Sequence, residues 1–310
     1  MKKRFSYTAL TAAIMRGTHL RLDGEPKVFR DELALRLCGT GAIASFVFAM
    51  IRMRLSSKSR AALEPMPYME MGRYLRAIMV MRSRHTEDLL AHALDRGIRQ
   101  FVILGAGLDS FAYRRNDLAT IVNTFEVDHP ASQQWKQRRL RKLGVTLPPN
   151  LTFVPVDFET QTLTDGLRKS GFLLAKPAFF SWLGVTQYIG IEAVYGMLRE
   201  IADLAPGTEI VFTYAVPQTL LPSEDRRLFA ICATTVAARG EPWITFFDPA
   251  EIASCLREIG FDQVVDFSPD EANARYFSGR SDGLRLPGLE HLVRAQVGDR
   301  SQPAQGGRAQ

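Results

Sequence analysis

Five short apolar segments, separated by stretches long enough to form helices, dominate the chain between residues 98 and 216. These segments lie in RQFVILGAG, IVNTFEVD, LTFVPVDF, AFFSWLGV and TEIVFTYAV. Strands this apolar with helical connections are typical of a parallel sheet that is covered on both faces. We therefore expect an α/β protein built on a doubly wound, mostly parallel sheet.

The flanking regions complete a division of the chain into three parts. Residues 1–97 carry apolar positions at three- and four-residue spacing, which predicts an N-terminal helical cap on the substrate side. Residues 98–297 form the sheet domain, with a helical insertion at about 218–247 and two further strand segments, DQVVDF and LEHLVRAQV. Asp248 is expected to cap a helix that has Pro249 in its first turn. The polar tail at 298–310 is expected to be disordered.

Composition argues against several classes of function. The 310 residues carry a formal net charge of +6, but the basic residues are scattered. Their one dense cluster, KQRRLRK at 136–142, is interpreted as a solvated helix face, so no nucleic-acid partner is expected. The three cysteines are widely spaced, which favours buried thiols over a disulfide framework or a metal site. No apolar run approaches the roughly 20 residues of a bilayer span, so we expect a cytoplasmic protein without a membrane partner.

A glycine turn follows the first strand, at the place where doubly wound sheets bind ligands. Gly105 and Gly107 leave this turn free of side chains, so a ligand can approach the backbone. Asp128 ends the second strand 21 residues after Gly107, and an acid at that distance can accept hydrogen bonds from both ribose hydroxyls of an adenosine. Glycines also end strands for purely conformational reasons, and Glu126 and Asp128 could be solvent-facing acids. Together, the turn and the acid favour a nucleoside site.

Two details distinguish between adenosine cofactors. A dinucleotide-binding turn carries a third glycine, whereas this chain has Ser110 there, preceded by Asp109. A carboxylate repels a pyrophosphate but is compatible with a ligand that carries sulfonium and ammonium charges. The third strand ends in Asp157 and Phe158, which can bind adenine through a hydrogen bond and ring packing. These residues favour S-adenosylmethionine, with a nicotinamide-dependent oxidoreductase as the alternative.

Six segments of the chain carry a resemblance to a known family. They are MRSRHTEDLL, RQFVILGAGLDSFAYR, FEVDHP, VPVDF, FFSWLGVTQYI and LREIADLAPGTEIVFTY, and the match runs from about Ser6 to Val297. The chain resembles the leucine carboxyl methyltransferase family, and more closely its bacterial branch of S-adenosylmethionine-dependent O-methyltransferases, which includes polyketide-modifying enzymes. The resemblance implies a class I methyltransferase (Rossmann-like) fold, with a seven-stranded, mostly parallel sheet whose last strand is antiparallel. It also implies an S-adenosylmethionine-dependent enzyme that methylates a carboxylate, or a phenolic hydroxyl, of a small-molecule metabolite.

The resemblance further implies which residues hold the cofactor. The family arginine that receives the cofactor carboxylate falls on Arg82, a residue type whose forked donors suit that partner, and Arg84 is a nearby competitor. A second basic contact, found in some relatives, matches Arg30. The family positions for the methionine part, the ribose and the adenine fall on residues already identified: Gly105, Asp128, Asp157 and Phe158.

The acceptor side of the reaction is less defined by the sequence. Many relatives carry Glu-Gly-Val after the fourth strand, where this chain has Leu183-Gly184-Val185, so the hydrogen bond of that glutamate is missing. Tyr188 is a candidate to line the acceptor pocket or a core tyrosine. A carboxylate acceptor needs no general base at neutral pH, whereas a hydroxyl acceptor does, and no catalytic residue or metal is assigned. A positively lined pocket would select a carboxylate. A binding protein that holds the cofactor without turnover is a further alternative.

Overall fold

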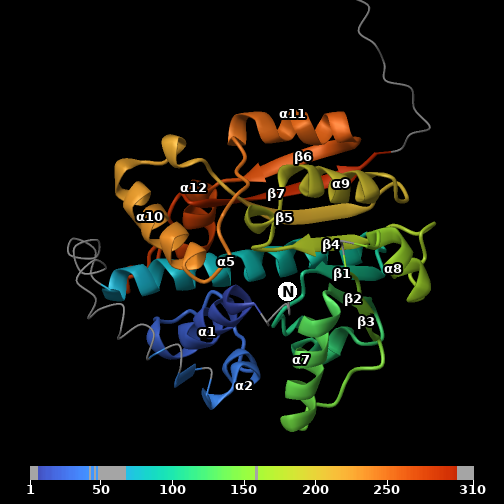
Figure 1. Cartoon of the computed structure of the whole chain (residues 1–310), viewed down its shortest axis with the longest axis horizontal. Coiled ribbons are helices and arrows are strands. Elements are labelled where there is room, and N and C mark those ends of the chain that lie inside the picture. Colours follow the sequence, from blue (N-terminus) through green and yellow to red (C-terminus); the bar gives the residue numbers. More distant parts are fainter. Residues whose placement is uncertain (1–5, 42, 45–46, 48–67, 158–159, 299–310) are drawn as a thin grey trace, which may run out of the picture.

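A single seven-stranded sheet forms the centre of the computed structural model, which describes residues 6–41, 43, 44, 47, 68–157 and 160–298. The strand order is β3-β2-β1-β4-β5-β7-β6 (Figure 1). The strands are β1 (Gln100–Leu104), β2 (Asn123–Asp128), β3 (Leu151–Pro155), β4 (Phe179–Trp182), β5 (Glu209–Ala215), β6 (Phe261–Phe267) and β7 (Glu290–Val297). Only β7 runs antiparallel to its neighbours, β5 and β6. The predicted fold class and the antiparallel last strand are confirmed.

The strands are apolar along their whole length because both faces of the sheet are covered. In β1, Val102 and Leu104 belong to one hydrophobic cluster, whereas Phe101 and Ile103 belong to another. Successive side chains of a strand point to opposite faces. One cluster contains residues of the helices α8, α9 and α11 together with Met71 and Tyr74 near the start of α5, and the other contains residues of α5 from Ala77 onward, so different helical segments cover the two faces (Figure 1).

Three of the helices described below precede the first strand, and the others lie between the later strands. The helices are α1 (Tyr7–Leu22), α2 (Ala34–Cys38), α5 (Tyr68–Asp95), α6 (Phe111–Arg114), α7 (Pro130–Lys142), α8 (Leu163–Lys169), α9 (Ile191–Ala202), α10 (Ser223–Ala237), α11 (Pro249–Ile259) and α12 (Pro269–Ala272). Asp248 accepts a hydrogen bond from the Ala250 amide at the start of α11, as predicted. A short π-helix, Asn273–Phe277, follows α12 between β6 and β7.

The helices of the first 97 residues have two different positions. Helix α5 packs on the sheet, where Ala77 and Met81 share a buried cluster with Phe179 of β4. Helices α1 and α2 lie farther out and pack against each other, with Ile14 and Leu37 in a third cluster that also includes Leu140 of α7 (Figure 1). The predicted N-terminal layer is therefore one covering helix of the sheet and an outer helical pair.

The basic cluster on α7 differs from its interpretation as a solvated face. Lys136 is only 1% exposed, and its Nζ atom lies 2.7 Å from Oε2 of the buried Glu126 on β2. Arg139 donates hydrogen bonds to the carbonyl oxygens of Arg36 and Leu37. Because α7 packs beside β2, a buried carboxylate on that strand requires a cation from the helix. The interpretation is therefore wrong for Lys136.

Further expectations concern membrane-spanning segments, metal sites and the C-terminal tail. In the part of the chain that the structure describes, no helix is long and apolar enough to cross a membrane. Within those same residues no group of three metal-binding side chains occurs, and the three cysteines carry free thiols. Apart from Gly298, the predicted tail lies outside the described residues.

Candidate functional site

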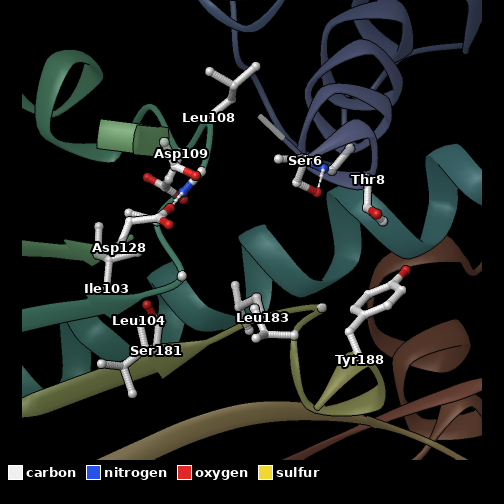
Figure 2. A pocket seen from close by; sticks show the side chains of 18 of the residues that line it. Ser6, Thr8, Ile103, Leu104, Leu108, Asp109, Asp128, Ser181, Leu183 and Tyr188 are labelled. Atoms are coloured by element: carbon white, nitrogen blue, oxygen red, sulfur yellow. Dashed lines mark hydrogen bonds between the residues drawn. The ribbon is translucent and has the colours of Figure 1, made fainter. Parts of the chain in front are cut away.

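A cavity of about 350 Å³ opens at the carboxyl ends of β1, β2 and β4. Its walls come from the turn after β1, from Asp128 at the end of β2 and from residues 183–185 after β4. Asp109 and Asp128 lie on one side, and Thr8 of α1 and Tyr188 lie across from them (Figure 2). Ligands of doubly wound sheets bind at this edge, so the cavity is the candidate site.

The glycine turn after β1 has a backbone that only glycine adopts without strain. Gly105 has φ +61° and Gly107 has φ +43°, both in the left-handed region. A Cβ on Gly105 would lie 2.8 Å from Cγ2 of Val185, and one on Gly107 would lie 3.0 Å from Cβ of Ala9. Conformation and close packing therefore both require glycine here, and the turn presents backbone rather than side chains to the cavity.

Asp128 connects the second strand to that turn. Its Oδ2 atom accepts a hydrogen bond from the Gly107 amide at 2.6 Å, and its Oδ1 atom accepts one from the His129 amide at 2.7 Å. Burial raises the pKa of the carboxyl, and the two amide donors oppose that rise. A carboxylate accepts about four hydrogen bonds, so Asp128 has acceptor capacity left for a ligand in the cavity.

The two candidate arginines of α5 occupy different environments. Arg82 lines the cavity with a side chain that is 10% exposed, and its Nη1 atom lies 3.7 Å from Oε2 of Glu290. Burial lowers its pKa, and Glu290 opposes that effect. Gly184 contacts the guanidinium so closely that a Cβ there would collide with it. Arg84 is exposed and pairs with Asp88 at 2.8 Å, so the structure places Arg82 at the cavity and Arg84 outside it.

Three predicted cofactor contacts do not lie in the described wall of the cavity. Asp157 follows β3, and its Oδ2 atom is 3.8 Å from Nε2 of His129. Phe158 lies outside the described residues. Arg30 is largely exposed and pairs with Glu25 at 3.1 Å, whereas its neighbour Asp31 is buried and contacts Arg16 and Ser110. Of the predicted residues, the structure brings together those at the glycine turn and β2, on α5 and after β4: Arg82, Gly105, Gly107, Asp128 and Tyr188.

Arg16 is a cavity residue that the sequence did not indicate. It donates to Asp31 at 3.0 Å and to the Leu108 carbonyl at 2.7 Å, and so connects α1 to the glycine turn. Ser110 donates to the same Asp31 carboxylate at 2.6 Å. These partners are far apart in the sequence, and no local pattern reports such a contact. Asp109 accepts a hydrogen bond from the Phe111 amide at 2.7 Å and adds a negative charge to the cavity.

A second, smaller cavity of about 120 Å³ adjoins the first. Both cavities are lined by Thr8, Arg82, Gly184 and Tyr188. Elsewhere the lining of the second cavity is mostly apolar and comes from α5, α10 and the loop that follows α10: Met71, Leu75, Ile78, Met79, Ile231, Val236 and Trp243. Burial raises the pKa of Tyr188 to about 12, so this tyrosine is a neutral group at the junction of the two cavities.

Comparisons with solved structures confirm the fold. A protein of the DUF574 family from Streptomyces avermitilis superimposes with a TM-score of 0.60 at 17% identity, covering 94% of this chain and 98% of its own. A protein from Thermobifida fusca, proposed to be a methyltransferase, has a TM-score of 0.53 at 20% identity and covers 79% and 90%.

Sequence comparisons identify the family. Residues 9–202 match the leucine carboxyl methyltransferase family. The Bacillus subtilis protein YktD, proposed to be an S-adenosyl-L-methionine-dependent methyltransferase, is 32% identical over 305 residues, which are 95% of this chain and 98% of YktD. A Mycobacterium tuberculosis protein of the same proposed activity is 34% identical over 149 residues, 48% of this chain and 46% of its own length. The names agree with the predicted cofactor and give no support to an oxidoreductase. The chain therefore belongs to the leucine carboxyl methyltransferase family.

Proposed function

We propose that this chain transfers the methyl group of S-adenosyl-L-methionine to an oxygen atom of a small, largely apolar molecule. The methyl donor occupies the first cavity and the acceptor occupies the second. The observation that carries the proposal is the shared wall, since Thr8, Arg82, Gly184 and Tyr188 line both cavities. Two substrates held in adjoining cavities meet at that wall.

The residues of the first cavity suit this donor. Asp128 retains acceptor capacity for ribose hydroxyls after its bonds to the backbone amides of Gly107 and His129. Arg82 offers a forked donor for a carboxylate. Asp109 supplies negative charge for a cationic ligand. The side-chain-free turn at Gly105 leaves room for the close approach of a nucleoside.

The main catalytic contribution of this chain is to position the methyl donor and the acceptor. The bound donor supplies a methyl group that its sulfonium already activates. The protein holds the two reactants close and aligned, an arrangement that contributes on the order of 7–11 kcal/mol to lowering a barrier. The apolar lining of the second cavity excludes water from the reacting atoms.

Two observations support an acceptor molecule that has an apolar body and is methylated on oxygen. The family is named for methyl transfer to a carboxyl group, which supports oxygen as the methylated atom. The side chains of Met71, Ile78, Ile231 and Val236 contribute apolar surface to the second cavity and favour a ligand with a hydrocarbon body. Leu183 stands in the wall of the first cavity, and its side chain contributes packing alone.

Calorimetry and labelled methyl transfer test the proposal. We expect the protein to bind S-adenosyl-L-methionine, to ignore NAD, and to transfer a labelled methyl group to members of a panel of apolar acids and phenols. Release of label by mild alkali identifies a methyl ester, and resistance to alkali identifies a methyl ether. Absence of S-adenosyl-L-methionine binding contradicts the proposal. Binding without transfer to any acceptor, including those in a cell extract, favours the non-catalytic alternative.

A further inference from the structure

A buried carboxylate with one unpartnered oxygen atom lines the second cavity. Glu290 is the first residue of β7, and its side chain is 9% exposed. Among the described residues, its Oε1 atom has no hydrogen-bond partner. Its Oε2 atom lies 3.7 Å from Nη1 of Arg82, an ion-pair separation that is longer than a hydrogen bond. Buried polar atoms are normally paired, so a ligand of this cavity is expected to supply a hydrogen-bond donor.

Glu290 lies beside the wall that the two cavities share. Its ion-pair partner Arg82 is one of the four residues common to both linings, together with Tyr188. In the sheet, Glu290 is paired with Ala215, the last residue of β5, which also lines the second cavity. The carboxylate is therefore next to the place where an acceptor atom has to meet the methyl donor.

The charge on Glu290 discriminates between classes of acceptor. A carboxylate acceptor would stand beside this buried carboxylate and be repelled by it, because Coulomb interactions between buried charges are only weakly screened. A hydroxyl group can instead donate a hydrogen bond to Oε1. Arg82 is paired with Glu290 and is assigned to the carboxylate of the methyl donor in the first cavity, so it is not available to an anionic acceptor in the second. Arg239 is the other cation of the lining, and it stacks over the Tyr7 ring at 3.9 Å.

We propose that Glu290 is the general base of this enzyme and that the acceptor is a phenolic hydroxyl on an apolar body, not a carboxylic acid. This inference rests on the function proposed above. The phenolic O–H proton passes to Oε1 of Glu290, and the oxygen pair forms the new bond to the methyl carbon. The electron pair of the broken carbon–sulfur bond stays on sulfur, which becomes a neutral thioether. The products are an aryl methyl ether, S-adenosylhomocysteine and protonated Glu290.

The surroundings of Glu290 set its response to pH. Burial raises the pKa of the carboxyl, and the Arg82 guanidinium, the Thr213 hydroxyl and His291 oppose that rise. The titratable and charged side chains that line the cavity with it come from α1, α5, residues 186–188, α10 and the turn after α10: Tyr7, Arg82, Tyr188, Cys232 and Arg239. His291 is adjacent on β7 and hydrogen-bonds Asp266. A base must be ionised, so activity is expected to fall on the acid side as Glu290 takes up a proton.

Two matched ligands and one isosteric substitution test this inference. In wild type saturated with S-adenosylhomocysteine, 4-ethylphenol is expected to bind at least tenfold more tightly than 4-ethylbenzoate by calorimetry. Glu290→Gln removes the negative charge and the proton acceptor without changing the shape, and it is expected to abolish or reverse that preference. The control Glu224→Gln changes an exposed carboxylate on α10 and should leave the preference intact.

Kinetics provide the second readout. With a phenolic acceptor, Glu290→Gln is expected to lower kcat by roughly 100-fold or more and to remove the acid limb of the pH profile, because general-base catalysis contributes 10²–10⁴-fold. Tighter binding of the benzoate to wild type, binding of neither probe, or a Gln variant with a kcat within threefold of wild type would overturn the proposal. Failure of the wild-type protein to bind S-adenosyl-L-methionine would instead refute the proposed function itself.

Discussion

Replacing Gly105 with alanine separates the backbone requirement of the glycine turn from its packing requirement. An alanine at φ +61° costs about 1–2 kcal/mol, because a left-handed residue brings its Cβ close to the following carbonyl oxygen. The new Cβ would also lie 2.8 Å from Cγ2 of Val185, well inside the ordinary carbon–carbon contact of about 3.5–4.0 Å. Such overpacking typically costs about 1–3 kcal/mol. We therefore expect Gly105→Ala to lower the free energy of unfolding by about 2–5 kcal/mol.

The chain offers a matched control for the backbone contribution. Gly144, which follows α7, has φ +64°, and a Cβ there would meet nothing within 4 Å. Gly144→Ala should therefore cost only the backbone part, about 1–2 kcal/mol. Val185→Ala removes the methyl groups that collide, so the double variant with Gly105→Ala should be less destabilised than the sum of the single changes by about 1–3 kcal/mol.

Urea unfolding measures these free energies, and calorimetry with S-adenosyl-L-methionine measures the effect on the site. Equal destabilisation by Gly105→Ala and Gly144→Ala would refute the account of the turn. So would strict additivity of Gly105→Ala with Val185→Ala. Recovery of stability without recovery of cofactor affinity in the double variant would show that the added methyl group also obstructs the ligand.

Three further predictions concern charged residues of the site and its support. Arg82→Lys should weaken S-adenosyl-L-methionine binding at least tenfold by loss of the forked donor, whereas Arg84→Lys on the exposed face of the same helix should leave the dissociation constant unchanged in calorimetry. Lys136→Met should destabilise the fold by about 3–5 kcal/mol in urea unfolding because it leaves Glu126 buried and uncompensated, and adding Glu126→Gln should restore most of that loss. Cofactor affinity should fall on acidification, because burial raises the pKa of Asp128 and its carboxylate then becomes protonated. The Asp128→Asn variant should show no such decline in affinity at acidic pH. A decline of the same size in that variant would exclude Asp128 as its source.

The features that the sequence predicted correctly have local causes. The β1 segment ends in a glycine turn, and β2 ends in Asp128, so parallel pairing of the two strands brings the turn and the acid together. The apolar character of the strands follows from burial on both faces of the sheet. Periodicity and a capping residue were sufficient to predict helix α11 and its start at Pro249.

The features that the sequence did not reveal depend on contacts between distant segments. Arg16 and Asp31 reach the glycine turn from α1 and the loop after it, and Glu290 reaches Arg82 from the last strand. Lys136 looked like one more basic residue of a solvated helix until its contact with Glu126 was known. Neither charge pattern nor spacing reports such pairs, because each partner is ordinary in its own segment.

The central claim is that Asp128 and the glycine turn together hold the nucleoside half of S-adenosyl-L-methionine, and calorimetric titration of wild type and Asp128→Ala tests it most directly. Hydrogen bonds to a charged group contribute about 1.5–3 kcal/mol each, and 1.4 kcal/mol corresponds to a tenfold change in affinity. We predict that wild type binds the cofactor and that Asp128→Ala, while still folded by circular dichroism, binds it at least tenfold more weakly. A folded variant whose affinity stays within a factor of two of wild type would contradict the claim.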